Sequence, residues 1–137
     1  MLDRMLLVNS LAIKKYLLSK PESIEDYPFD DHTPVFKVQG KMFALLSQYQ
    51  GRLLLNVKCD PHHAIELRDV FSDVIPAYHM NKRHWNSLIV EGDLPMGEIQ
   101  RQIDHSYALV VKGLKKSIRE GLEVRHGALA LYRGSSI

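Results

Sequence analysis

The fold is decided by residues 35–58, which read VFKVQGKMFALLSQYQGRLLLNVK. Three runs in this segment have the apolar content and alternation typical of β-strands: Val35–Val38, Met42–Leu46 and Leu53–Lys58. The dipeptides Gln39-Gly40 and Gln50-Gly51 separate the runs, and glycine at such positions favours a tight turn. Because short connections join antiparallel neighbours, the segment predicts a three-stranded antiparallel meander.

Helical periodicity on both sides of the meander predicts three helices. In residues 3–20 apolar side chains recur at three- and four-residue intervals, and Pro21 ends the pattern. A second helix is expected over Pro61–Phe71, because Asp60 is a good N-cap and proline is favoured at the first helical position. The clearest periodicity, over residues 94–116, predicts the third helix.

The remaining stretches complete the expected architecture. Trp85–Val90 predicts a strand that returns to the sheet, and the acidic segment 22–31 is interpreted as a solvated connector. We therefore expect the α+β class: an antiparallel sheet with flanking helices, forming one domain over residues 1–116. Residues 117–137 are a C-terminal extension of unknown role, and they fit either a frayed appendage or a strand that pairs elsewhere.

Composition is that of an ordinary soluble globular chain. The 137 residues carry a net charge of +2, so an electrostatic argument for a partner must come from charge distribution. A single cysteine, Cys59, excludes an intramolecular disulfide and favours a reducing compartment. No apolar run has the length of a membrane span or a signal-peptide core. We expect a cytoplasmic protein with no membrane partner, monomeric, with a weak dimer as the alternative.

The densest polar stretch reads YHMNKRHWN and covers residues 78–86. It holds two fixed positive charges, two histidines, two asparagines, a tyrosine and the only tryptophan of the chain. No acidic residue lies between Asp73 and Glu91 to neutralise it. Flanked by apolar runs, the stretch predicts a surface loop with a turn at Asn81–His84, and such loops often carry binding residues.

Several motifs, in this order and spacing, resemble the MmcQ/YjbR-like family. They are Leu17–Pro21, Glu25–Phe29, Val35–Val38, Gly40–Ala44, Leu55–Pro61, Tyr78–Asn86 and Ile103–Tyr107. The resemblance covers about residues 10–115 and leaves the tail beyond Lys116 outside the pattern. It implies a small α+β domain similar to the double-wing C-terminal domain of a phage transcription factor. By fold analogy alone, it also implies a DNA-binding or regulatory role.

DNA binding requires cations that reach phosphates and polar groups that reach base edges. Six cations are candidate phosphate contacts: Lys37, Lys41, Arg52, Lys58, Lys82 and Arg83. Asn81 and Asn86 have the side chain that reads adenine, and Arg83 has the one that reads guanine. The alternative interpretation is that these are ordinary solubilising charges, because the net charge falls short of the usual basic footprint.

A rival hypothesis is a protein- or small-molecule-binding module that uses a cleft beside Tyr78–Trp85. The residues expected to line or support it are Tyr78, His79, His84, Trp85 and Asn86. Tyr78 and Trp85 could stack on bases, as aromatic residues do in single-strand binders. Their alternative role is structural, with large rings packed under the loop and polar tips directed outward.

A second rival is an enzyme built on Cys59 with His62, His63 or His79. A nearby helix N-terminus and Lys58 would lower the thiol pKa, whereas Asp60 would raise it. Recognised catalytic motifs are absent, and the histidines lack the spacing of a helical zinc site. We therefore expect no enzyme activity, no metal and no cofactor.

Overall fold

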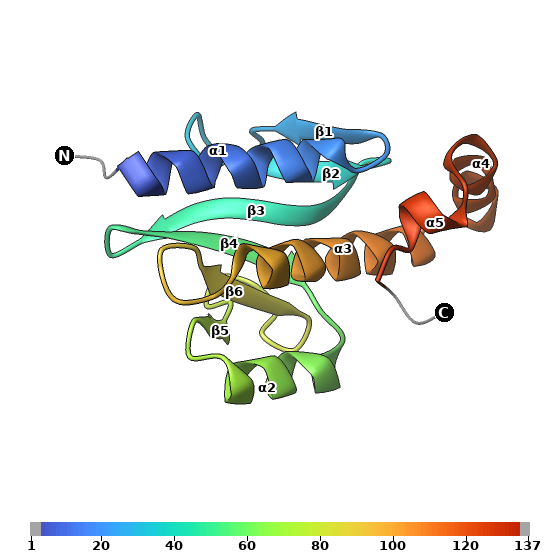
Figure 1. The fold of residues 1–137 in the computed structure, drawn as a ribbon. Coiled ribbons are helices and arrows are strands. Elements are labelled where there is room, and N and C mark those ends of the chain that lie inside the picture. Colours follow the sequence, from blue (N-terminus) through green and yellow to red (C-terminus); the bar gives the residue numbers. More distant parts are fainter. Residues whose placement is uncertain (1–3, 135–137) are drawn as a thin grey trace.

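The structure is a computed structural model that describes residues 4–134. Its strands are β1 (Ser23–Asp26), β2 (Val35–Val38), β3 (Lys41–Tyr49), β4 (Arg52–Lys58), β5 (Val74–Pro76) and β6 (Trp85–Ile89). They form one antiparallel sheet in the order β1-β2-β3-β4-β6-β5 (Figure 1). The predicted meander is its centre, and the predicted returning strand pairs with β4.

Both hairpins of the meander close through two-residue loops with positive φ angles. Gln39 and Gly40 have φ angles of 49° and 78°, and Gln50 and Gly51 have 52° and 76°. Turns with two positive φ angles twist in the same sense as the strands they join. The two Gln-Gly dipeptides thus form the tight turns that the sequence predicted.

Five helices accompany the sheet: α1 (Arg4–Ser19), α2 (Pro61–Val70), α3 (Met96–Lys112), α4 (Lys116–His126) and α5 (Ala128–Leu131). The first three confirm the predicted helices. The Asp60 carboxylate caps α2 by accepting hydrogen bonds from the backbone N–H groups of His62 and His63. No helix within residues 4–134 is both long and apolar enough to cross a membrane.

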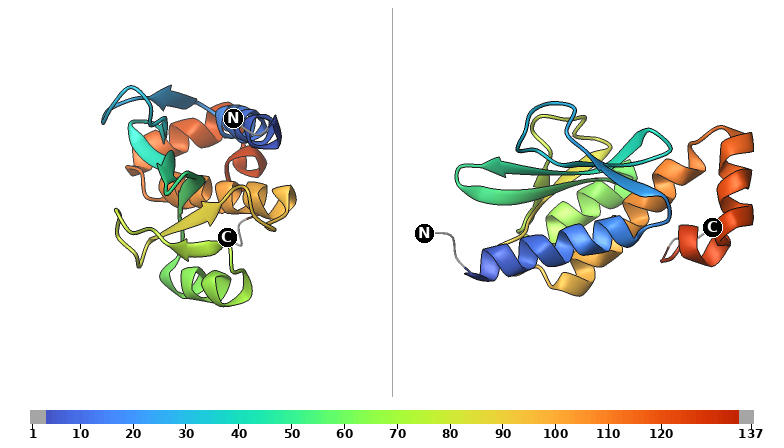
Figure 2. Two further views of the ribbon diagram at one scale, coloured as in Figure 1. Left: turned by 90° about the vertical axis from the view of Figure 1, so that its left-hand side faces the viewer. Right: turned by 90° about the horizontal axis from the view of Figure 1, so that it is seen from above.

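The sheet has one face covered by helices and one without a helical layer. Figure 2 shows α1 and α3 on the same side of the sheet. Phe36, Leu55 and Leu88 point to this side and are fully buried in the core cluster, together with residues of α1, α2 and α3. Burial of such side chains is the main stabilising contribution to the fold. We call the other side the open face; it carries Lys37, Asn56 and the strand residues that share their alternation.

Two edge strands depart from the expected architecture. The acidic segment, interpreted as a connector, contains β1, which pairs with β2. Pairing brings Asp26 to Lys37, with 2.8 Å between the carboxylate Oδ2 and the ammonium Nζ. The lysine lowers the pKa of Asp26. The second addition is β5, a three-residue strand beside β6.

The C-terminal extension is helical as far as the structure describes it. It forms α4 and α5, so neither a frayed appendage nor a pairing strand describes it. Leu122, Leu131 and Tyr132 lie in the same core cluster as the sheet. The end of α4 is held to Glu22, whose Oε2 accepts from Arg125 Nε at 2.7 Å and lies 2.7 Å from His126 Nε2.

The substitution Glu22→Gln should reveal this attachment, because its effect on the free energy of unfolding should depend on pH. The hydrogen bonds from Arg125 and His126 lower the pKa of Glu22 from 4.5 to about 2. A lowered pKa stabilises the fold above the ordinary pKa, and the contribution is lost as pH falls towards the folded value. We expect the substitution to cost about 1 kcal/mol or less near pH 7, because the pair is partly exposed.

The difference between wild type and Glu22→Gln should then shrink between pH 4.5 and about 2, as measured by urea unfolding. Glu120→Gln is the matched control, because Glu120 is exposed on α4 and forms a long ion pair of 3.9 Å with Lys116. A pH-independent difference for Glu22→Gln would contradict the role assigned to its charge.

Candidate functional site

The polar stretch, residues 78–86, forms the loop between β5 and β6 as far as His84 and then the first two residues of β6. Helix α2 holds the loop from behind. Asn81 starts a turn: its backbone carbonyl accepts from His84 N at 3.1 Å and its Oδ1 accepts from Arg83 N at 3.0 Å. Arg68, on α2, donates from its Nη2 to the Lys82 carbonyl and from Nε to Asn86 Oδ1, the latter at 2.7 Å. The guanidinium thus fixes the loop to the helical side of the sheet.

In front of this support, the loop places Tyr78 over the open face. Its ring centroid lies 6.4 Å from that of Tyr49, at an interplanar angle of 33°. Lys82 Nζ lies 5.3 Å from the centroid of the Tyr78 ring, within cation–π range. Tyr49 is 45% exposed and Tyr78 is 57% exposed. The result is a solvent-facing pair of aromatic rings beside a positive charge.

A polar network forms the floor beside these rings. Asn56 is 5% exposed, and its Nδ2 donates to the Leu45 carbonyl at 3.1 Å and to Ser47 Oγ at 2.9 Å. Its Oδ1 accepts a hydrogen bond of 2.5 Å from Ser87 Oγ. Because every polar atom of the Asn56 side chain has a partner, the network stabilises three adjacent strands without leaving an unsatisfied group.

Tyr78 and the floor together enclose a small pocket of about 80 Å³. It is lined by Leu45, Ser47, Gln48, Tyr49, Leu54, Asn56, Tyr78, His79, Met80 and Ser87. Pockets that enclose a drug-sized molecule measure roughly 300–1,000 Å³. This pocket therefore has room for one group of a ligand that lies along the face, and not for a whole small molecule.

The predicted cations do not form one cluster. Lys37, Arg52 and Lys58 belong to the open face by strand register, and Lys82 lies on the loop above it. Lys37 is already paired with Asp26. Lys41 begins β3, whereas Arg52 pairs with Tyr49 at the end of that strand. At the usual rise per residue the two cations are about 25 Å apart. The structure thus brings Tyr78 and Lys82 together and spreads the strand cations along a track.

Some predicted site residues have structural roles instead. Asn86 is 1% exposed, accepts from Arg68 and donates from Nδ2 to the Ala64 carbonyl at 3.4 Å, so its amide is engaged within the fold and does not face a ligand in this structure. Through Arg68 it is linked to the loop. Trp85 and His84 are half-buried, and the His84 carbonyl accepts from Cys59 N at 2.7 Å. Asn81, Arg83 and His79 remain exposed.

The thiol of Cys59 has the properties of a core side chain. It is 1% exposed, and burial, with a contribution from Asp60, raises its pKa to about 12. A thiol at that pKa is a poor nucleophile at neutral pH. His63 packs edge-on against His105, with ring centroids 5.3 Å apart and an interplanar angle of 67°. Within residues 4–134, no group of three or more His, Cys, Asp or Glu side chains is arranged to hold a metal.

Three important residues of this site were not identified from sequence. Arg68 has no distinguishing signal in the predicted helix, because its role depends on contacts with residues that follow it by 14 and 18 positions. Tyr49 lies beyond the run Met42–Leu46 that predicted the strand, and no sequence pattern marks it. Asn56 carried a usable signal, because a lone amide in the middle of an apolar strand must find hydrogen-bond partners if it is buried.

Comparisons with known proteins agree on one family. A family model described as YjbR matches residues 18–109. The chain is 36% identical to uncharacterized protein YbdF of Escherichia coli O157:H7 over 101 residues, which cover 74% of this chain and 81% of the relative. It is 31% identical to uncharacterized protein YjbR of Escherichia coli strain K12 over 106 residues, which cover 77% and 90%.

A solved structure extends the likeness to the C-terminal helices. The crystal structure of a Deinococcus radiodurans protein with the domain DUF419 superimposes with a TM-score of 0.76 at 34% sequence identity. The match covers 95% of this chain and 94% of that protein. The 5% of this chain outside the match is shorter than residues 117–137, so at least part of the extension has a counterpart in the Deinococcus protein. The matches to the two Escherichia coli relatives cover less of this chain.

Proposed function

Because the chain belongs to the YjbR family and carries two exposed tyrosines beside a lysine on an open sheet face, we propose that it is a DNA-binding module that uses this face. The observation that carries the proposal is the arrangement of Tyr49, Tyr78 and Lys82. It combines ring faces, to which any base can stack, with a cation that can reach a phosphate.

The form of DNA that suits this arrangement is a single strand. Bases in a duplex are stacked on one another, whereas an unpaired strand can turn its bases onto exposed aromatic rings. The Tyr49 and Tyr78 centroids are 6.4 Å apart, so both rings can contact one short segment. The family's resemblance to a double-wing transcription factor domain supports the same class of ligand by analogy of fold.

The distribution of cations supports contact with an extended backbone. Arg52 and Lys58 occupy the two ends of β4 on the face that also carries Tyr49. Lys82 is added from the loop, and Lys37 is a weaker candidate because Asp26 neutralises it. A regulatory role would follow from occupancy of this face by DNA. The rival small-molecule hypothesis is disfavoured by the volume of about 80 Å³ beside Tyr78.

Lys82→Ala should weaken binding and make it less sensitive to salt. Each phosphate contact with a single strand contributes about −0.7 to the slope of log K against log salt concentration. With Arg52, Lys58 and Lys82 engaged, we expect a wild-type slope of about −2, and a variant slope shallower by about 0.7. The measurement is a titration of a labelled oligothymidine at a series of salt concentrations.

Lys116→Ala is the matched control for that titration. It removes the same charge from α4, where the lysine side chain is 79% exposed and forms an ion pair with Glu120 at 3.9 Å. The control should leave both affinity and slope unchanged. Equal effects of the two substitutions would indicate attraction to net charge and would contradict a site at the loop.

A further inference from the structure

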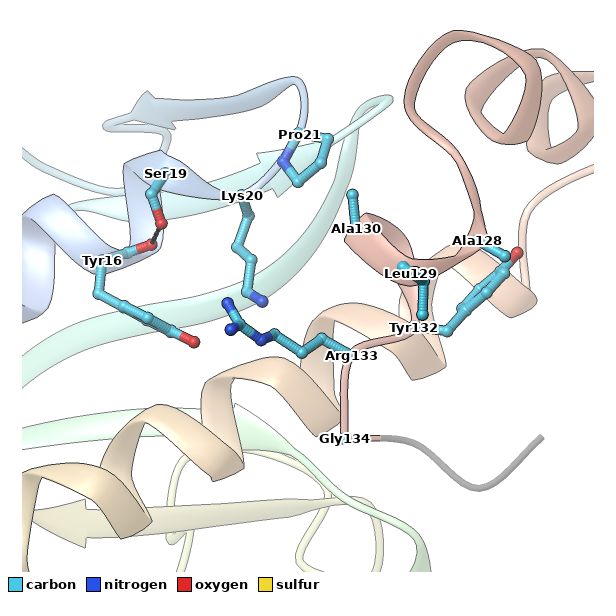
Figure 3. A pocket seen from close by; sticks show the side chains of 10 residues that line it. All are labelled: Tyr16, Ser19, Lys20, Pro21, Ala128, Leu129, Ala130, Tyr132, Arg133 and Gly134. Carbon is cyan, nitrogen blue, oxygen red and sulfur yellow. Dashed lines mark hydrogen bonds between the residues drawn. The ribbon is translucent and has the colours of Figure 1, made fainter.

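A second pocket lies on the other side of the molecule, where the end of α1 meets the segment around α5. It has a volume of about 740 Å³, within the range of small-molecule sites. Figure 3 shows the side chains of Lys20 and Arg133 converging in it from the two segments, with Tyr16 beside them. The DNA-binding proposal uses none of these residues.

Lys20, the first cation of the pocket, is buried, and its charge is already offset by a carboxylate. Lys20 is 6% exposed, and its Nζ forms an ion pair with Asp104 Oδ1. Tyr16 donates a hydrogen bond of 2.6 Å to the same oxygen. The lysine Nζ also lies 5.3 Å and 5.6 Å from the ring centroids of Tyr16 and Tyr107. Since an ammonium group has three donors, the pair with Asp104 leaves capacity for a further acceptor.

The second cation, Arg133, has no counter-charge among residues 4–134. Within residues 4–134, Arg133 forms no hydrogen bond or ion pair, and the described residues that line the pocket include no aspartate or glutamate. Asp104 offsets one positive charge, which leaves the pocket with an excess of one. Two cations directed at a shared space repel each other unless an anion lies between them.

Two nearby carboxylates are engaged elsewhere. Glu22 follows Pro21 in the chain, but its oxygens accept hydrogen bonds from Arg125 and from Gln39. Glu123 accepts from the Tyr132 hydroxyl at 2.8 Å. Neither carboxylate therefore supplies the charge that Arg133 lacks.

The rest of the wall is largely apolar, and this selects the kind of anion. Pro21, Ala130 and Leu129 line the pocket, and Leu129 is 91% exposed. We propose that this pocket binds a small organic anion, with its carboxylate or phosphate group between Lys20 and Arg133 and its apolar body against these side chains. Arginine suits the binding of this head group, because its planar guanidinium matches the geometry of both carboxylate and phosphate.

The test uses the full chain and three six-carbon probes: hexanoate, hexyl phosphate and neutral hexanol. We expect both anions to shift the amide NMR signals of Lys20, Ala130 and Arg133 at lower concentrations than hexanol does. Whichever anion binds more tightly identifies the head group. Inorganic phosphate should bind more weakly than hexyl phosphate, because it leaves the apolar wall uncovered.

Arg133→Ala should weaken anion binding about tenfold while leaving stability unchanged, because the guanidinium has no hydrogen-bond or ion-pair partner within residues 4–134. Lys116→Ala, which removes an exposed charge from α4, is the control and should bind the anions as the wild type does. The proposal is overturned if neither anion binds, if hexanol binds as well as the anions, or if Arg133→Ala binds them with unchanged affinity.

Discussion

Lys20→Met is expected to lower the free energy of unfolding by about 3–5 kcal/mol, the usual cost of removing one partner from a buried ion pair. The lysine and Asp104 are 6% and 8% exposed, so the carboxylate left behind would be largely shielded from water. The cation–π contacts with Tyr16 and Tyr107 would be lost as well. A loss of this size is a large part of the total stability of an ordinary domain.

Most of that cost should disappear when Asp104 is neutralised in the same chain. The variant Lys20→Met/Asp104→Asn keeps an oxygen that can accept the hydrogen bond from the Tyr16 hydroxyl but removes the buried charge. We expect it to be more stable than Lys20→Met alone, because the penalty arises from the unpaired carboxylate.

Urea unfolding followed by the fluorescence of Trp85, the only tryptophan, measures both variants. A cost below about 1 kcal/mol for Lys20→Met would be the value of an exposed pair and would contradict the buried position assigned to it. Failure of Asp104→Asn to restore stability would show that the loss comes from packing of the lysine stem.

The centre of the fold could be predicted because its signals are local. The Gln-Gly turns require positive φ angles at known positions, and Asp60-Pro61 carries its own cap. The edge strands β1 and β5 could not be predicted in the same way. Each has three or four residues, without apolar alternation, and each exists because a neighbouring strand offers unpaired backbone groups.

The tail shows the same limit. Its helices α4 and α5 are short, and Val124 and Leu129 are 87% and 91% exposed, so their sequence has no continuous apolar stripe. Leu122 and Leu131 are buried because they pack against the core that the rest of the chain forms, so the sequence of the tail alone does not mark them as core residues. Long-range packing of this kind leaves no periodic pattern to detect.

The candidate site could be predicted in part. The density of polar side chains in residues 78–86 correctly indicated an exposed loop. Charge counting along the chain suggested a basic sheet, but β1 brings Asp26 to Lys37 and the other cations are spread along the strands. The partner ring of Tyr78 could not be inferred, because the contact with Tyr49 arises only when the loop folds over the open face.

The replacement of both tyrosines, Tyr49→Ala/Tyr78→Ala, is expected to weaken binding of single-stranded DNA by at least about 30-fold. Stacking of a base on an aromatic ring contributes about 1–3 kcal/mol, and the variant removes two rings. Stability should change little, because the rings are 45% and 57% exposed.

Tyr49→Phe/Tyr78→Phe separates stacking from hydrogen bonding at the same two positions. Phenylalanine keeps the ring face and removes only the hydroxyl, so this variant should bind nearly as tightly as the wild type. If it binds as weakly as the alanine variant, the hydroxyls make the contacts and the stacking account is wrong.

The central claim, that DNA occupies the open face of the sheet, is tested most directly by fluorescence anisotropy of a labelled oligothymidine of about 12 nucleotides. Wild type, Tyr49→Ala/Tyr78→Ala and Tyr49→Phe/Tyr78→Phe would be titrated at one low salt concentration. The account predicts tight binding by the wild type and the phenylalanine variant and a loss of at least about 30-fold for the alanine variant. Equal affinities for all three proteins, or no binding by the wild type, would contradict it.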